Sequence, residues 1–369
     1  MTEQNLHSEP VDDEGAGATA LAGKTAFEQV FAMATLFTPW ALRTAVTLRL
    51  PDLIAAGVSD PVDLATATYT HPESLHRLLR HLVNVGIILE SVSGEVELSD
   101  LGTVLQEDHP GGLSRILDQS DGLIRRIDLV TSELPEAIRS GGPVWEKLHE
   151  RPFWADIIGD SELSASFDAT MAIHAGRLGP GLAEVYDWSN VGHVVDVGGG
   201  IGEILSVLLR THPHLRGTLV DLPETAARAA EGFRKAGLDG RARVVGQSFF
   251  DALPDDGDVY LLSHVIHDWP DVSSRSILRR CREAAGRTGK VLVAERLVPP
   301  TGSVGNAMVS QRDLGVLLIL GSKERDAEQF RMLGDSADLT LTSVTPVISG
   351  DPVFLLEFAA EENEPGDRV

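Results

Sequence analysis

A glycine-rich stretch is the most distinctive chemical feature of the sequence. The segment "HVVDVGGGIGEIL" runs from His193 to Leu205, with glycines at Gly198, Gly200 and Gly202 directly after an apolar, strand-like run. Glycine tolerates positive φ and has no Cβ atom, so the backbone of such a loop can touch a ligand. A helix that starts after the loop would also offer free N–H groups to a carboxylate or another anion. The stretch therefore predicts a ligand-binding loop.

Two classes of ligand compete for this loop. A dinucleotide site requires G-x-G-x-x-G. Its third glycine would stand where the chain has Glu203, and Asp196 precedes the loop. Two carboxylates would repel a pyrophosphate, but they suit a ligand that carries an ammonium or a sulfonium charge. S-adenosylmethionine is such a ligand, although the glycine loop alone is a weak signal for it.

Two later residues fit a nucleoside ligand. Asp221 ends the second strand-like segment, 23 positions after Gly198, where a carboxylate can accept hydrogen bonds from ribose hydroxyls. Phe249, in "GQSFFDALP" after the third segment, offers a face on which adenine can stack. The alternatives are that Asp221 caps the turn before Pro223 and that Phe249 belongs to the core.

The strongest candidate for acid–base chemistry is His267. It follows the fourth strand-like segment in "LLSHVIHDWPD", and a histidine with a near-neutral pKa can take the proton of a phenol. A carboxylate on its other ring nitrogen would fix the tautomer; Glu295, which ends the fifth segment, and Glu324 are both candidates. Asp268 is adjacent, but no further cluster has metal-ligand spacing, and no G-x-S-x-G serine motif is present.

These residues share one site only if the C-terminal part of the chain folds as a doubly wound sheet. From residue 192 onward, the strand-like segments "HVVDV", "GTLVD", "ARVVG", "DVYLLS" and "KVLVAE" alternate with mostly helical ones. The alternation predicts an α/β fold with a mostly parallel sheet and helices on both faces. The carboxyl ends of parallel strands meet at one edge, where ligands bind. "LTSVTPVISG" and "DPVFLLEFA" predict a closing hairpin.

The N-terminal part has the pattern of a winged-helix module. Residues 25–110 are mainly helical, with Asp60 as an expected N-cap and with Gly94 at a turn inside the alternating "ILESVSGEVELSDLG". One helix offers residues that could contact DNA, namely Arg77, Arg80 and His81. The alternative, that the module packs against another subunit, is favoured by the acidic chain around that helix.

Composition narrows the function further. The 369 residues carry 31 Lys and Arg against 55 Asp and Glu, a net charge of −24, which disfavours nucleic acid as a partner. The lone Cys281 lies in a helical pattern, which predicts a buried structural thiol and a protein of the reducing cytoplasm. No apolar run is long enough for a membrane span, and the acidic N-terminus lacks the pattern of a signal peptide.

Taken together, the motifs resemble those of the S-adenosylmethionine-dependent O-methyltransferases of small molecules. "VVDVGGGIG", "LVDLPE", "GQSFFDALP", "HVIHDWPD", "VAERLVP" and "DLGVLLILGSKERDAEQF" come in the order and spacing of that family. The family includes plant caffeic acid and chalcone O-methyltransferases and bacterial enzymes of antibiotic pathways. The resemblance covers about residues 25–360. It implies a Rossmann-like methyltransferase domain, a winged-helix-like dimerisation domain, a homodimer, and an aromatic or polyketide-type acceptor.

The expected organisation has four parts. They are a disordered tail over 1–22, a winged-helix-like dimerisation domain over 23–110, a helical linker and acceptor-pocket segment over 111–188, and an S-adenosylmethionine-binding catalytic domain over 189–361. Residues 362–369 are expected to form a second short tail.

The resemblance also assigns cofactor-binding residues by motif position. Gly198 matches the loop glycine beside the methionine moiety, with Gly200 in the same loop, and Asp221 matches the ribose-binding acid. The pair of residues that contacts the adenine in the family falls on Ser248 and Phe249. A further residue near the cofactor falls on Ser263. The chain departs from the family here, because Ser248 stands where aspartate is common and Ser263 where lysine is common.

For the acceptor, the resemblance implies that His267 is the catalytic base and that Glu295 and Glu324 flank it. The segment that encloses the acceptor in the family supplies the substrate-binding candidates Trp154, Phe167, Met171 and His174. Three hypotheses remain: an O-methyltransferase for an aromatic or enolic hydroxyl, a relative that uses the cofactor for hydroxylation or pericyclisation, and a metabolite-sensing winged-helix regulator.

Overall fold

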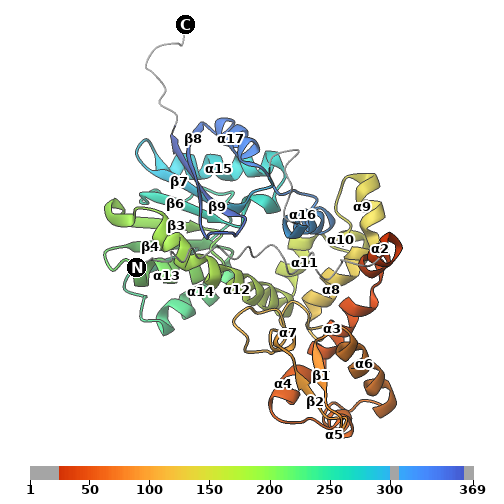
Figure 1. The fold of residues 1–369 in the computed structure, drawn as a ribbon. Helices are drawn as coiled ribbons and strands as arrows, with labels where there is room; N and C mark the ends of the chain where they lie inside the picture. The colour runs from red at the N-terminus through yellow and green to blue at the C-terminus, as the bar shows by residue number, and fades with distance from the viewer. Residues whose placement is uncertain (1–24, 300–306, 361–369) are drawn as a thin grey trace, which may run out of the picture. The chain divides into compact units, whose positions relative to one another are not determined.

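The computed structural model describes residues 25–299 and 307–360 (Figure 1). The described residues divide into two compact units, one that ends at Gln119 and one that begins at Ser120. The two predicted tails lie outside the described residues. Among the described helices, none combines the length and the apolar character needed to cross a membrane.

The first unit has the predicted winged-helix pattern. Asp60 accepts hydrogen bonds from the backbone N–H groups of Val62 and Asp63 and so caps a helix that begins at Pro61. Gly94, at φ +87°, turns the chain between two short antiparallel strands. The elements are α2 (Ala26–Ala34), α3 (Phe37–Thr47), α4 (Leu50–Ala55), α5 (Pro61–Ala67), α6 (Pro72–Asn84), β1 (Ile88–Glu90), β2 (Val96–Leu98) and α7 (Asp100–Thr103).

The helix considered for DNA contact is α6. Its Arg77 is paired with Glu73 on the same helix. His81 lies 3.0 Å from the hydroxyl of Thr38, so it is part of the internal packing of the unit.

The second unit begins with a helical segment. Gly141, at φ +70°, ends one of these helices, and Asp160 caps the longest of them. The helices are α8 (Gly122–Val130), η1 (Thr131–Glu133), α9 (Leu134–Ser140), α10 (Trp145–His149), α11 (Phe153–Gly159), α12 (Ser161–Val185) and η2 (Trp188–Asn190).

A seven-stranded sheet with the order β5-β4-β3-β6-β7-β9-β8 follows. The first five strands in this order are parallel, and β9 and β8 form the predicted antiparallel hairpin at the edge. The strands are β3 (His193–Val197), β4 (Arg216–Asp221), β5 (Ala242–Gly246), β6 (Val259–Ser263), β7 (Lys290–Arg296), β8 (Leu339–Pro346) and β9 (Val353–Ala360).

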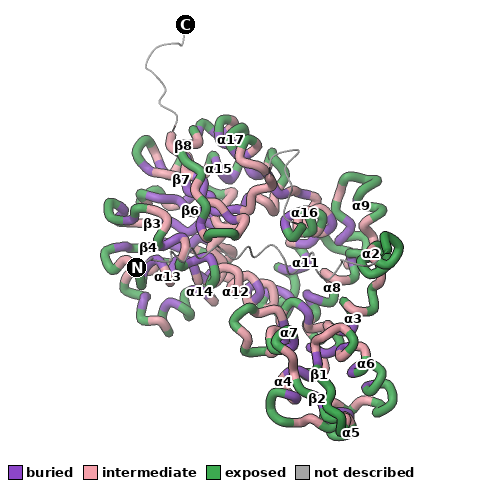
Figure 2. The backbone as a smooth tube through the Cα atoms, viewed as in Figure 1, coloured by how far each residue is buried: buried purple, intermediate pink, exposed green. Residues whose placement is uncertain are grey.

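Helices cover both faces of this sheet. Alternate strand residues face opposite sides, so Val194 and Leu261 join one core and Val195 and Leu262 the other. Helices α12, α13 (Glu203–Thr211) and α14 (Pro223–Lys235) pack on the first face, and α15 (Asp271–Ala285) and α17 (Ala327–Asp335) on the second. Cys281 of α15 is fully buried, as predicted. Figure 2 shows the central strands as the buried layer.

Strand order also fixes where a ligand can bind. From β3 the chain continues into β4 on one side, and β6 pairs on the other side of β3. In a doubly wound sheet, the carboxyl ends of the strands at such a switch point border a crevice. The glycine loop after β3 and the 3-10 turn η3 (Ile266–Asp268) after β6 both lie there.

Gly202 gives a test of the loop's backbone. It has φ +87°, and an added Cβ would lie 2.5 Å from Cζ of Phe233. Exposed Gly237 has φ +68°, with no atom near an added Cβ. We expect Gly202→Ala to lower the free energy of unfolding by about 1–3 kcal/mol more than Gly237→Ala, because overpacking adds to the shared backbone strain. Urea unfolding measures both, and equal losses would contradict the packing seen at Gly202.

Candidate active site

The glycine loop is closed on one side and open on the other. Gly198 and Gly200 have φ values of +72° and +59°, in the left-handed region. A Cβ atom on Gly198 would lie 2.9 Å from the side chain of Val265 and 3.5 Å from that of Phe249, whereas one on Gly200 would meet nothing within 4 Å. The loop therefore leaves room for a ligand beside Gly200, and the ring of Phe249 lies at its edge.

Two acidic side chains crowd this loop. Asp196 is buried, and its Oδ2 atom has no hydrogen-bond partner among the described residues. Burial, with the charge of Asp221, raises the pKa of Asp196 to about 7. Asp221 accepts hydrogen bonds from the N–H groups of Gly200 (2.8 Å) and Leu222 (2.7 Å), yet burial raises its pKa to about 6. A positively charged ligand would relieve this crowding.

A row of aromatic rings leads from the loop toward α12. Phe249 contacts the edge of Trp269, with ring centroids 5.9 Å apart. Trp269 lies parallel to Trp154 at 6.2 Å, and Trp154 meets Phe167 of α12 edge-on at 5.4 Å. Within the described residues, the indole N–H of Trp154 has no partner. The row gives the site an apolar, aromatic wall.

The two serines predicted at the cofactor site lie at this edge of the sheet. The hydroxyl of Ser248 accepts a hydrogen bond from the backbone N–H of Phe250 at 3.2 Å and so shapes the turn that carries Phe249. Ser263 is the last residue of β6, and its hydroxyl lies 3.4 Å from Nδ1 of His264.

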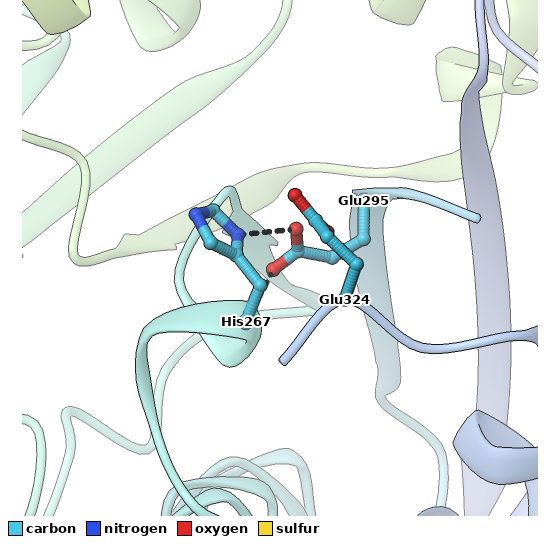
Figure 3. A group of neighbouring side chains, drawn as sticks. All are labelled: His267, Glu295 and Glu324. Carbon is cyan, nitrogen blue, oxygen red and sulfur yellow. Dashed lines mark hydrogen bonds and ion pairs between the residues drawn. The ribbon is translucent and has the colours of Figure 1, made fainter. Parts of the chain in front are cut away.

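His267 is held between two carboxylates. Its Nδ1–H donates to Oε2 of Glu295 at 2.7 Å (Figure 3), and Oδ1 of Asp268 lies 3.1 Å from Nε2. Glu295 comes from the end of β7, and its Oε1 also accepts from the N–H of Ile266 at 2.7 Å. Of the two acids predicted to bind the ring nitrogen, Glu295 is therefore the one in place. Asp268 is a contact that the sequence did not predict.

Glu324 lies beside this pair without a hydrogen bond to it. Both of its carboxylate oxygens are buried and find no partner in the part of the chain that the structure describes, and burial raises its pKa. His267, Glu295 and Glu324 offer ligand atoms within 4.8 Å of one another, a spacing that could hold a metal ion. Because Glu295 already accepts the ring N–H and a backbone N–H, the geometry favours acid–base chemistry instead.

The turn that carries His267 is tied down by Arg325. This fully buried guanidinium donates to the carbonyl oxygens of Ile266 (3.0 Å) and Trp269 (2.9 Å) and to the carboxylate of Asp271 (2.7 Å). Arg325 directly follows Glu324, so one short segment both brings an acid to the site and fixes the backbone on either side of His267.

Among the remaining acceptor candidates, Met171 and His174 lie on α12 and are half-buried. Burial, together with the charges of Arg312 and Arg296, lowers the pKa of His174 to about 4. These two arginines were also missed in the sequence. Trp269 and Asp268 are adjacent to His267 in "HDW" and could have been found there, whereas nothing in the spacing points to Arg312.

Fold and site together are those of a Rossmann-like domain with a histidine–carboxylate pair at the sheet edge that bears the glycine loop. Two family profiles match the chain: an O-methyltransferase domain over residues 131–339 and an O-methyltransferase dimerisation domain over residues 32–108. The chain belongs to the O-methyltransferase family.

Several relatives are biosynthetic enzymes of Streptomyces. The chain is 44% identical to the 2,7-dihydroxy-5-methyl-1-naphthoate 7-O-methyltransferase of Streptomyces carzinostaticus, over 86% of this chain and 93% of that one. It is 38% identical to the aclacinomycin 10-hydroxylase of Streptomyces purpurascens, over 90% of each. An O-methyltransferase of neocarzinostatin biosynthesis, solved with S-adenosylmethionine and 2-hydroxy-5-methyl naphthoic acid, superposes with a TM-score of 0.82 at 41% identity, covering 92% of this chain and all of that one.

The carboxylates around His267 determine the pH range in which its ring loses a proton. Burial alone would lower the pKa of His267, but the charges of Glu295 and Asp268 outweigh it and hold the pKa well above 6.5. The unprotonated ring therefore forms only as the pH rises through this elevated value. We expect Glu295→Gln to move the titration of His267 to lower pH, and Asp268→Asn to do so by less.

Nuclear magnetic resonance of histidine-labelled protein measures this titration directly. Asp255→Asn, at an exposed site away from His267, is the control and should leave it unchanged. A His267 titration that stays in place in Glu295→Gln would show that the pair does not set the pKa.

Proposed function

We propose that this enzyme uses His267 as general base to methylate an aromatic or enolic hydroxyl of a specialised metabolite, with S-adenosylmethionine as donor. The proposal is carried by the 2.7 Å hydrogen bond between His267 and Glu295 at the sheet edge that also bears the glycine loop. The resemblance to methyltransferases of naphthoate and other antibiotic-pathway substrates supports it. The cytoplasmic location remains a prediction.

The loop residues fit the proposed cofactor. The buried, unpartnered Oδ2 of Asp196 and the elevated pKa values of Asp196 and Asp221 favour a ligand with positive charge. Gly198 and Gly200 would lie along the methionine moiety, Asp221 at the ribose, Ser248 and Phe249 at the adenine, and Ser263 nearby. When bound, the cofactor supplies a methyl group activated by a positively charged sulfur.

His267 provides the base. Because Glu295 holds the proton on Nδ1, the lone pair of the neutral ring lies on Nε2. In this proposal, the acceptor hydroxyl takes the place beside Nε2 that Asp268 has in this structure, and its proton passes to that nitrogen. Glu295 then stabilises the charged ring. The carboxyl group of Glu324 lies on the same side, close to His267 and Glu295.

The aromatic wall orients the acceptor. Trp154, Phe167 and Trp269 can pack against a flat ring system, and Met171 provides a flexible apolar contact from α12. Alignment of reactants in a site without water can supply about 7–11 kcal/mol of the barrier reduction. Most of the catalytic effect therefore comes from the walls of the site, and His267 adds a smaller part.

One relative is a hydroxylase, so hydroxylation is the second candidate activity. Methyl transfer forms one S-adenosylhomocysteine for each product molecule, and the product is heavier by one methylene. A hydroxylase forms no S-adenosylhomocysteine and adds oxygen. Mass spectrometry of the products from a panel of phenols, starting with 1,4-dihydroxy-2-naphthoic acid, distinguishes the two.

The variant His267→Ala tests the role of the base. We expect kcat to fall at least about a hundredfold, since general-base assistance contributes about 10²–10⁴-fold, while the Kd for S-adenosylhomocysteine stays within a factor of about two. The control is His76→Ala, at an exposed histidine of α6. Turnover near the parent value in His267→Ala would remove this residue from the mechanism.

We infer that the first unit mediates homodimer formation. It matches the dimerisation domain of the family. In the single chain, α2 and α3 expose large apolar side chains to solvent; the exposed fractions are 75% for Phe27, 62% for Phe31 and 81% for Phe37. Exposed apolar surface of this extent indicates a protein interface.

Charge introduced into this surface should weaken the dimer. We expect the double variant Phe27→Asp/Phe31→Asp to raise the dimer dissociation constant at least about tenfold, because burial of one aromatic side chain is worth about 1.5–3 kcal/mol. Sedimentation equilibrium measures it, and Tyr69→Asp, at a fully exposed aromatic of the same unit, is the control. An unchanged mass for the double variant would place the interface elsewhere.

A further inference from the structure

Two arginines near the candidate base have no counter-ion of their own. Arg296 is the last residue of β7, and Arg312 lies on α16 (Ala307–Leu320), which packs against the turn that carries His267. Within residues 25–299 and 307–360, neither side chain forms an ion pair or a hydrogen bond, and Nη1 of Arg296 is buried.

An unpaired buried charge is costly, and two of them repel each other. Burial and the charge of Arg296 lower the pKa of Arg312 to about 10, so it still carries its proton at neutral pH. Both guanidinium groups therefore stay positive, close enough to affect each other. The two unpaired charges raise the free energy of the folded protein, and an anion bound by both would lower it.

The neighbouring groups do not supply that anion. Burial and the positive charges of the two arginines lower the pKa of His174 and that of His264. Both histidine rings are therefore neutral. Asp268 faces Nε2 of His267. Glu324 is near Arg312, yet its oxygens make no hydrogen bond, and burial raises its pKa.

We propose that Arg296 and Arg312 bind a carboxylate of the aromatic acceptor. The charge of these arginines is opposite in sign to that of the acidic glycine loop. His264 connects the two functions, because its ring lies 5.8 Å from that of His267 and its buried Nε2 has no partner. The acceptor class is therefore a hydroxyl-bearing aromatic acid. This inference rests on the proposed methyl-transfer function and specifies its substrate.

One other molecule could bring a carboxylate, namely the methionine part of the cofactor. The N-terminus of α13 offers backbone N–H groups for that carboxylate, which leaves the arginines for the acceptor. The two sources predict different losses: the acceptor assignment predicts weaker binding of an aromatic acid, and the cofactor assignment predicts weaker binding of S-adenosylhomocysteine.

Calorimetry on the full chain, saturated with S-adenosylhomocysteine, tests the proposal with two probes of nearly equal shape: 1,4-dihydroxy-2-naphthoic acid and its neutral 2-carboxamide. We expect the acid to bind about ten- to a hundredfold more tightly than the amide, as charge-assisted hydrogen bonds allow. In Arg312→Gln this preference should fall to about threefold or less, and Arg296→Gln should act in the same direction.

Two controls make the result specific. Arg216→Gln removes an exposed positive charge at the opposite end of the sheet and should keep the preference for the acid. The Kd for S-adenosylhomocysteine, measured first on every variant, reports whether the fold and the cofactor site are intact. If that affinity is absent in the parent protein, the proposed function itself fails.

Three results would overturn the carboxylate assignment while leaving methyl transfer in place. The first is equal affinity of the parent protein for acid and amide. The second is an undiminished preference for the acid in both arginine variants. The third is a loss of S-adenosylhomocysteine affinity in Arg312→Gln comparable to the loss of acid affinity, which would assign the arginines to the cofactor's carboxylate.

Discussion

One buried carboxylate organises the reactive part of this molecule. Glu295 is fully buried at the end of β7, where an isolated charge would be unstable. It is stabilised because it accepts the ring N–H of His267 and the backbone N–H of Ile266. These bonds and the charge of His267 lower the pKa of Glu295 although burial alone would raise it. The same bonds fix the η3 turn, the tautomer of His267 and the direction of its free nitrogen.

The fold was largely predictable from the sequence, because it depends on local periodicity. The strand-like segments, the closing hairpin and the capped helix at Asp60 all appear in the structure, since alternating apolar residues and capping side chains act within a few positions. The convergence of Asp221, His267 and Glu295 on one sheet edge was also predictable, because parallel topology places the carboxyl ends of strands together.

Contacts between distant side chains were less accessible. The sequence offered both Glu295 and Glu324 as partners of His267, and only the register between β6 and β7 puts Glu295 at its Nδ1 atom. Arg312 could not be identified from the sequence. Its helix lies far along the chain, and the residue is notable only because it has no counter-ion among the described residues. Spacing carries no information about an absent partner.

Charge divides the site into two parts of opposite sign. The glycine loop carries two acids with raised pKa values, which suits a cation, and the proposed acceptor side carries two arginines with neutral histidines beside them. His267 belongs to neither part, since its charge is balanced by Glu295 and Asp268. A cationic donor and an anionic acceptor would then each be drawn to its own side of the base. Such a division would orient both reactants before any proton moves, with one arginine supplied by the end of β7 and the other by α16.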